Sequence, residues 1–137
     1  MSYSELIRAF FERSTALQWY WTVYIIVIGG ILGFSTLRER PEIVTVILVT
    51  ILYGCFAYKN LGAIEDTLAE RQAIRIAIKD YPASGSNAGD IEPVRKVLEP
   101  TLAFSDPEGV RYFHVACDLL TIAAVWAKEW RRRKLAT

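Results

Sequence analysis

The sequence predicts an all-α integral membrane protein: a transmembrane helical hairpin, a cytoplasmic extension of the second helix, and a long C-terminal helix. Two uncharged stretches near the start of the chain predict the hairpin, and strong helix-start signals near Pro107 predict the C-terminal helix. That last helix is either amphipathic or a third span. The three parts are residues 1–60, 61–110 and 111–137.

Composition limits the class of protein. The chain has 137 residues, 53% of them hydrophobic, and 16 Lys and Arg side chains nearly balance 15 Asp and Glu, giving a net charge of +1. A charge so near zero excludes a strongly basic nucleic-acid-binding protein, and the hydrophobic fraction excludes intrinsic disorder. The length is that of one domain.

The first predicted span is the uncharged stretch Leu17–Leu37. It has the roughly 20 residues that a helix needs to cross about 30 Å of hydrocarbon. Trp19, Tyr20 and Trp21 at its start are rings of the kind expected at a membrane interface. A cleaved signal peptide is the competing interpretation, but the run is longer than a signal's apolar region, and acids as well as arginines precede it. We expect the segment to be retained.

The second predicted span is Ile43–Tyr58, which is also uncharged but shorter. Glu42 and Lys59 at its ends have side chains long enough to reach the lipid headgroups, so we count it as a span. Tyr53 and Tyr58 lie toward its exit, where interfacial rings are expected.

A charged connection, Arg38–Glu42, joins the two spans, and Pro41 in it ends one helix and opens the next. The spans therefore form an antiparallel hairpin. Helices in lipid pack through small residues, and Gly29 and Gly33 have the G-x-x-x-G spacing, with Gly54 available in the other span. Three interpretations stay open. The glycines form a face for dimerisation, they pack the two helices of one hairpin together, or they face lipid and have no packing role.

The second span is predicted to continue into water as a helix over Asn60–Asp80, which is rich in helix formers. Its end stays open, because apolar and other side chains alternate over Ile74–Ile78 as they do in a strand. Arg71, Arg75 and Lys79 recur every four residues there. This ridge indicates a solvated face, with an anion site or contact with lipid headgroups as the alternatives.

The segment Tyr81–Gly109 holds four of the five prolines and is predicted to be mostly a linker, with a short helical turn near Val94–Leu98. A long helix follows it. Ser105 or Asp106 is the expected N-cap, and Pro107 suits the first helical position.

Hydropathy does not decide whether this C-terminal helix is a third span. Asp118 lies well inside its apolar stretch and raises the free energy of membrane insertion by roughly 2.5–3.5 kcal/mol. The surrounding apolar residues lower it by about the same amount. Basic residues favour two spans: with both termini in the cytoplasm, 14 of 16 lie inside, whereas three spans divide them 9 against 7. We therefore predict two spans with cytoplasmic termini, in a bacterial or archaeal inner or plasma membrane.

The C-terminal helix carries two stripes. The polar stripe is Arg111, His114, Asp118, Thr121 and Lys128, and the apolar stripe is Tyr112, Ala116, Leu119, Ala123, Trp126 and Trp130. If the helix does not span, His114 and Asp118 are a surface ion pair; if it does, they are candidates for a proton or ion relay facing the bundle. The basic tail is predicted to contact lipid headgroups through Arg131, Arg132, Arg133 and Lys134.

No catalytic, metal or cofactor site is predicted. Cys117 lies beside His114 and Asp118, but three groups on one helix point apart and do not converge as a nucleophile, its base and an orienting acid must. With a single His, and with Cys55 far from Cys117 in the chain, neither a disulfide framework nor a zinc or haem site is indicated. We expect a protein that is not an enzyme.

The layout of Ala16–Asp80, a hairpin followed by a cytosolic helix, resembles that of the SLATT-type membrane modules of bacterial conflict systems. That resemblance is one of layout, and it implies a pore-forming effector. The residues themselves indicate a self-associating or accessory scaffold subunit, which docks through Gly29, Gly33 and the face Ala116–Trp130. The alternative is an oligomeric ion channel or pore lined by the polar stripe. Membrane lipids and further copies or a larger membrane complex are the expected partners, and nucleic acid is not.

Overall fold

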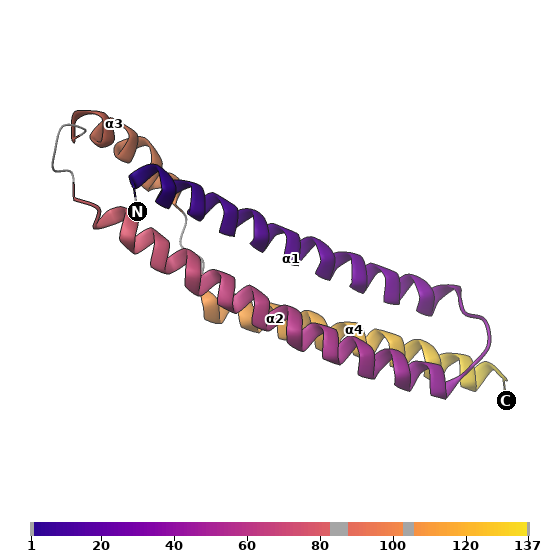
Figure 1. Cartoon of the computed structure of the whole chain (residues 1–137). Helices are drawn as coiled ribbons and strands as arrows, with labels where there is room; N and C mark the ends of the chain where they lie inside the picture. Colours follow the sequence, from indigo (N-terminus) through magenta and orange to yellow (C-terminus); the bar gives the residue numbers. More distant parts are fainter. Residues whose placement is uncertain (1, 83–87, 103–105, 137) are drawn as a thin grey trace.

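The chain folds into an elongated bundle of helices. The computed structural model describes residues 2–82, 88–102 and 106–136, with the backbone alone over 88–91. Its elements are α1 (Tyr3–Leu37), α2 (Ile43–Lys79), α3 (Ala88–Leu98), the 3-10 turn η1 (Glu99–Thr101) and α4 (Pro107–Ala136). In Figure 1, α1, α2 and α4 run along one another, and α3 lies at the end where α1 begins. The predicted all-α class is confirmed.

α1 and α2 form the predicted antiparallel hairpin, joined over residues 38–42. α1 begins with a capping box: the Glu5 N–H donates to the Ser2 hydroxyl at 3.3 Å, and the Ser2 N–H donates to the Glu5 carboxylate at 2.6 Å. The helices have 35 and 37 residues, well beyond the roughly 20 that a span needs. Each therefore extends past its apolar part.

The extension of α2 reaches Lys79 without a break, as predicted. The strand-like alternation near its end is resolved by helix geometry. Ile74 and Ile78 lie one turn apart and face α1, where Ile78 is fully buried, whereas Ile76 between them is half exposed.

A hydrophobic core closes this end of the bundle. It consists of Tyr3, Leu6, Phe10, Ile78 and Leu102, from α1, α2 and the residue after η1. Polar contacts around it also join α1 to α2: Arg13 pairs with Glu70 at 3.1 Å, and Arg71 of the predicted basic ridge lies 4.9 Å from the centre of the Phe10 ring. Apolar side chains form the core at this end, and Arg71 and Arg75 of the ridge are only partly exposed at its edge rather than fully solvated as predicted.

The predicted linker contains more helix than the sequence indicates, because α3 begins at Ala88, before the expected turn at Val94–Leu98. α4 begins at Pro107 as predicted. The Asp106 carboxylate caps it by accepting from the N–H groups of Glu108 and Gly109, both at 3.2 Å. The alternative cap, Ser105, lies outside the described residues.

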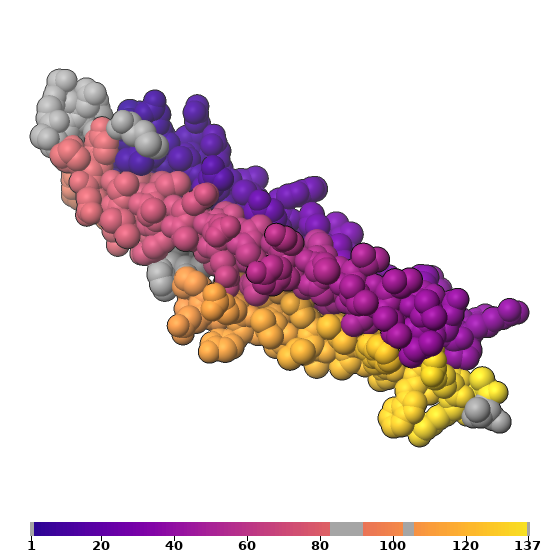
Figure 2. All heavy atoms as spheres, turned by 60° about the horizontal axis from the view of Figure 1, so that its bottom comes forward, coloured from indigo at the N-terminus to yellow at the C-terminus, as the bar shows by residue number. Residues whose placement is uncertain are grey.

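α4 lies beside both helices of the hairpin, parallel to α1 and antiparallel to α2. At one end Arg111 contacts Glu65 of α2, and at the other the N–H of Glu42 donates to Glu129. In Figure 2, α4 follows α2 along the surface of the bundle. The sequence favours two spans, with the C-terminal helix outside the membrane, whereas the apolar part of α4 lies level with the apolar part of the hairpin.

In this part of the bundle the distribution of polarity is reversed. Large apolar side chains are exposed on all three helices: Ile25, Ile26, Val44, Ile47, Leu48, Ile51, Leu52, Leu119 and Leu120. Polar side chains are buried among the helices, including His114, Thr121 and Glu129. Each of α1, α2 and α4 is also long and apolar enough to cross a membrane, so the described residues contain three candidate spans where the sequence favours two.

We expect Phe10→Ala to weaken the core at the α3 end far more than Phe11→Ala. Phe10 is 3% exposed and Phe11 is 49% exposed, so only the first substitution leaves a cavity, at a cost of about 3–5 kcal/mol. Hydrogen exchange of the amides near Leu6 and Ile78 measures the opening free energy of this end. Equal effects of the two substitutions would contradict the core assigned here.

Candidate functional site

One carboxylate joins the three long helices. The Tyr24 hydroxyl of α1 donates to Oδ1 of Asp118 at 2.8 Å, and the Tyr53 hydroxyl of α2 donates to the same oxygen at 2.6 Å. The other oxygen, Oδ2, lies 2.9 Å from Nδ1 of His114, one turn earlier in α4. Asp118 thereby receives three donors from three helices.

His114 is the second member of this cluster and is fully buried. Its Nε2 lies 3.3 Å from the amide nitrogen of Asn60, a buried residue of α2. An amide nitrogen only donates, so Nε2 accepts, and the remaining ring proton on Nδ1 points to Asp118. The Tyr24 ring stacks on the imidazole with its centroid 4.0 Å away. We call these five residues the Asp118 network.

A second buried carboxylate fixes α4 to the connection between α1 and α2. Glu129 is 1% exposed, and Oε1 accepts from the backbone N–H of Glu42 at 2.8 Å. Among the described atoms, the Glu42 side chain makes no capping bond, so Glu129 provides from α4 the cap at the start of α2. Guanidinium groups of Arg38, Arg132 and Arg133 lie 3.3–3.8 Å from its oxygens and balance its charge.

The polar stripe of α4 faces the hairpin, but its members do different things. His114 and Asp118 lie in the network, whereas the Thr121 hydroxyl donates back to the carbonyl of Cys117 in its own helix at 2.8 Å. Val125, which interrupts the stripe, is buried with them. The structure thus brings two of the five predicted residues into one site.

The other two predicted residues lie at opposite ends of the bundle. Arg111 contacts Oε1 of Glu65 at 2.5 Å, and this hydrogen bond lowers the pKa of the Glu65 carboxyl and raises that of the Arg111 guanidinium. The Lys128 ammonium donates to the Thr36 hydroxyl near the end of α1. These contacts lie where the apolar part of the bundle stops on either side.

The three glycines predicted to pack helices do not do so within the chain. No described atom outside its own helix neighbourhood lies within 4 Å of a Cβ placed at Gly29, Gly33 or Gly54. On α1, the side that faces the bundle carries the buried residues Tyr24 and Ser35, and helical spacing puts both glycines on the opposite side. Packing within one hairpin is therefore not what the structure has.

Sequence reasoning missed the partners of Asp118. Tyr53 was expected to be an interfacial ring, but it is buried and points to Asp118, because a hydroxyl in an apolar region needs an acceptor. Tyr24 carried the same signal, a lone hydroxyl in the middle of an uncharged stretch. Glu129 was also missed, although it is the one acid in the basic segment 128–134.

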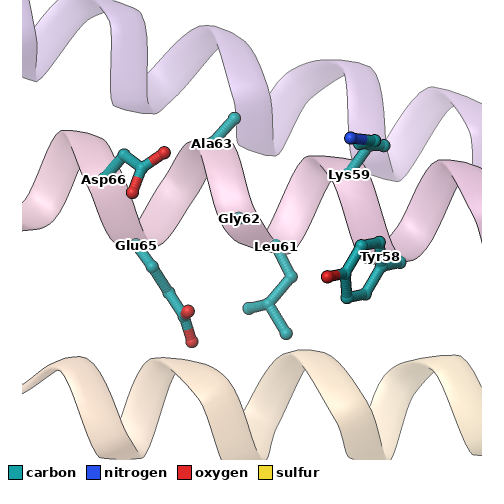
Figure 3. A pocket seen from close by; sticks show the side chains of 7 residues that line it. All are labelled: Tyr58, Lys59, Leu61, Gly62, Ala63, Glu65 and Asp66. Atoms are coloured by element: carbon teal, nitrogen blue, oxygen red, sulfur yellow. The ribbon is translucent and has the colours of Figure 1, made fainter.

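A shallow hollow of about 420 Å³ lies where α2 leaves its apolar part. It is lined by Tyr58, Lys59, Leu61, Gly62, Ala63, Glu65 and Asp66. Figure 3 shows Tyr58, Leu61 and Glu65 pointing toward α4. Its lining mixes one cation with two carboxylates, so it has no strong preference for a charged ligand of either sign.

In the described part of the chain, no three His, Cys, Asp or Glu side chains are grouped so that they could hold a metal ion. Both cysteines are free, with Cys55 exposed and Cys117 partly buried. Comparison with protein-family models, curated proteins and solved structures gave no match.

We expect removal of the acceptor at Asp118 to loosen α4 from the hairpin. Asp118→Ala removes the acceptor of the Tyr53 hydroxyl and one of the two acceptors of the Tyr24 hydroxyl, which also donates to the His114 carbonyl at 3.2 Å. Tyr53→Phe removes a single bond, which in membrane proteins is worth about 0.6 kcal/mol and at most about 1.7 kcal/mol. Unfolding of the detergent-solubilised chain measures both losses, with Asp118→Ala the larger.

Leu119→Ala is the matched control, because Leu119 is the neighbour of Asp118 and is 63% exposed on the outer surface. We expect it to change stability little. A larger loss from Leu119→Ala than from Asp118→Ala would show that α4 is held by its other face.

Proposed function

We propose that this protein is a non-enzymatic membrane subunit with three spans, which associates with further copies of itself or with a larger membrane complex. The observation that supports it is the reversed polarity of the apolar part of the bundle. There the polar groups of α1, α2 and α4 bond to one another inside, and the outer surface is apolar. Lipid is the solvent that suits such a surface.

The position of α4 extends the argument from two spans to three. Asp118 lies level with Tyr24 in the middle of the first predicted span and with Tyr53 in the second. If the hairpin crosses the bilayer, α4 therefore crosses it too. Three spans place the two ends of the chain on opposite sides of the membrane, in place of the shared cytoplasmic side that the sequence favours.

Two exposed surfaces of the bundle, one on α1 and one on α4, support self-association. Gly29 and Gly33 are exposed on α1, and neither has a side chain that would hold another helix away. Small residues of this kind let helices approach closely in lipid. The apolar stripe of α4 is exposed as well, from Tyr112 to Trp130.

The alternative, a pore lined by the polar stripe, finds less support. His114 and Asp118 are bonded to Tyr24, Tyr53 and Asn60 inside one chain. An ion pathway along them would require these bonds to open. We therefore place the functional surface of the protein on the outside of the bundle.

A thiol at position 26 tests the association face, because Ile26 is exposed one turn before Gly29 and Gly30. In a chain with Cys55→Ser and Cys117→Ser, we expect Ile26→Cys to form disulfide-linked dimers on oxidation of native membranes. Adding Gly29→Leu and Gly33→Leu should abolish the dimer, because two bulky side chains would hold the helices apart.

Leu52→Cys is the matched control, since Leu52 is just as exposed but lies on the outer side of α2. We expect it to cross-link weakly. Equal cross-linking from positions 26 and 52, or a dimer that survives both leucine substitutions, would rule out the glycine face.

The number of spans is tested by labelling the two ends of the chain. Single cysteines at Ser4 and Ala136, which are both exposed, are treated with a membrane-impermeant maleimide in intact bacterial cells. We expect one position to react before the cells are opened and the other only afterwards. Labelling of both from the same side would restore the two-span topology.

A further inference from the structure

We propose that a groove between the end of α1 and the last turns of α4 binds the phosphate group of an anionic phospholipid. The groove has a volume of about 230 Å³ and is lined by Thr36, Lys128, Arg131, Arg132 and Leu135. The inference rests on the proposed function, because the groove lies at headgroup depth only when the helices span.

The groove lies where the apolar surface of the bundle stops. Leu37 at the end of α1 and Trp130, on the opposite face of α4 but at the same level of the bundle, are both highly exposed. The Lys134 ammonium lies 4.4 Å from the centre of the Trp130 ring. A tryptophan with a neighbouring cation is typical of the depth at which phospholipid headgroups lie.

The groove has the charge of an anion site. Its described lining holds three cations and no acid. Glu129, the nearest carboxylate along α4, is buried and already contacts Arg38, Arg132 and Arg133. The segments around the groove also carry a net positive charge, because residues 38–42 and 128–134 contain seven Lys and Arg against three Glu.

One of the cations is held in place without being neutralised. Lys128 donates to the Thr36 hydroxyl, which is uncharged, so its side chain is oriented while its charge stays available. Arg132 donates to the backbone carbonyl of Ser35 and also pairs with Glu129, so it shapes the groove more than it adds free charge. Arg131 is exposed at the same groove, and a guanidinium can bind two phosphate oxygens at once.

A lipid fits this groove better than a soluble phosphate does. Leu135 gives the lining an apolar member beside the cations, which suits a ligand with a charged group and an apolar body. The hollow on α2 in Figure 3 is the contrast within the same molecule, because its one cation, Lys59, is accompanied by two carboxylates, Glu65 and Asp66, and the lining does not favour a phosphate. We therefore expect the groove at the last turns of α4, and not the hollow on α2, to prefer negatively charged lipids.

Electron paramagnetic resonance of spin-labelled lipids tests the proposal in the full-length chain, reconstituted in phosphatidylcholine bilayers. We measure the association of labelled phosphatidylglycerol relative to labelled phosphatidylcholine. One basic residue near a membrane surface is worth about a fivefold preference for anionic lipid. We expect a preference of at least that size, which Lys128→Gln with Arg131→Gln reduces to near one.

The control is Lys79→Gln with Lys96→Gln, which removes the same charge from exposed positions at the other end of the bundle. We expect it to keep the preference. No preference in the natural chain, or equal loss in the control, would overturn the proposal. So would a preference that excess inorganic phosphate abolishes but chloride at equal ionic strength does not, because the groove would then take soluble phosphate.

Failure of the proposed function has a different signature in the same experiment. If the three helices do not span, neither lipid shows the motionally restricted signal of lipid next to a protein. That result would overturn the membrane placement and the lipid site together. Restricted signals of equal strength from both lipids would overturn the lipid site alone.

Discussion

The structure depends on how a carboxylate is accommodated in an apolar region. A charged side chain in the middle of a bilayer is costly and is kept only where it meets polar partners. Asp118 meets three: hydroxyls from α1 and α2 and an imidazole from its own helix. Since Tyr24 and Tyr53 each lie within the uncharged stretch of a long helix, this one requirement fixes the depth of all three helices relative to one another.

Contacts at both ends of α4 agree with that alignment. Arg111 pairs with Glu65 on one side of the network, and Glu129 caps the start of α2 on the other. A shift of α4 by one turn would break all of these contacts at once. With the polar groups satisfied inside, the outer surface of the bundle is left to contact lipid, further copies of the chain and headgroups, and this is where we place its function.

The sequence predicts the hairpin well, because the absence of charge over Leu17–Leu37 and Ile43–Tyr58 is a local property. The start of α4 is predictable for the same reason, since Asp106 and Pro107 act on their own helix. The depth of α4 is not local. A hydropathy sum treats Asp118 as an unpaired charge that disfavours insertion. Its hydrogen-bond partners Tyr24 and Tyr53 are 94 and 65 residues away in the chain and do not enter that sum. The polar stripe is visible in the sequence, but what it faces is set by tertiary packing.

The most direct measurement is the environment of Leu119 in a bilayer. A spin label on Leu119→Cys, next to Asp118 but on the outer surface, is tested for collision with oxygen, which concentrates in lipid, and with a water-soluble nickel complex. We expect strong collision with oxygen and little with nickel, because α4 crosses the membrane with this face toward lipid. Free access of the nickel complex to position 119 would place α4 in water and contradict the three-span bundle.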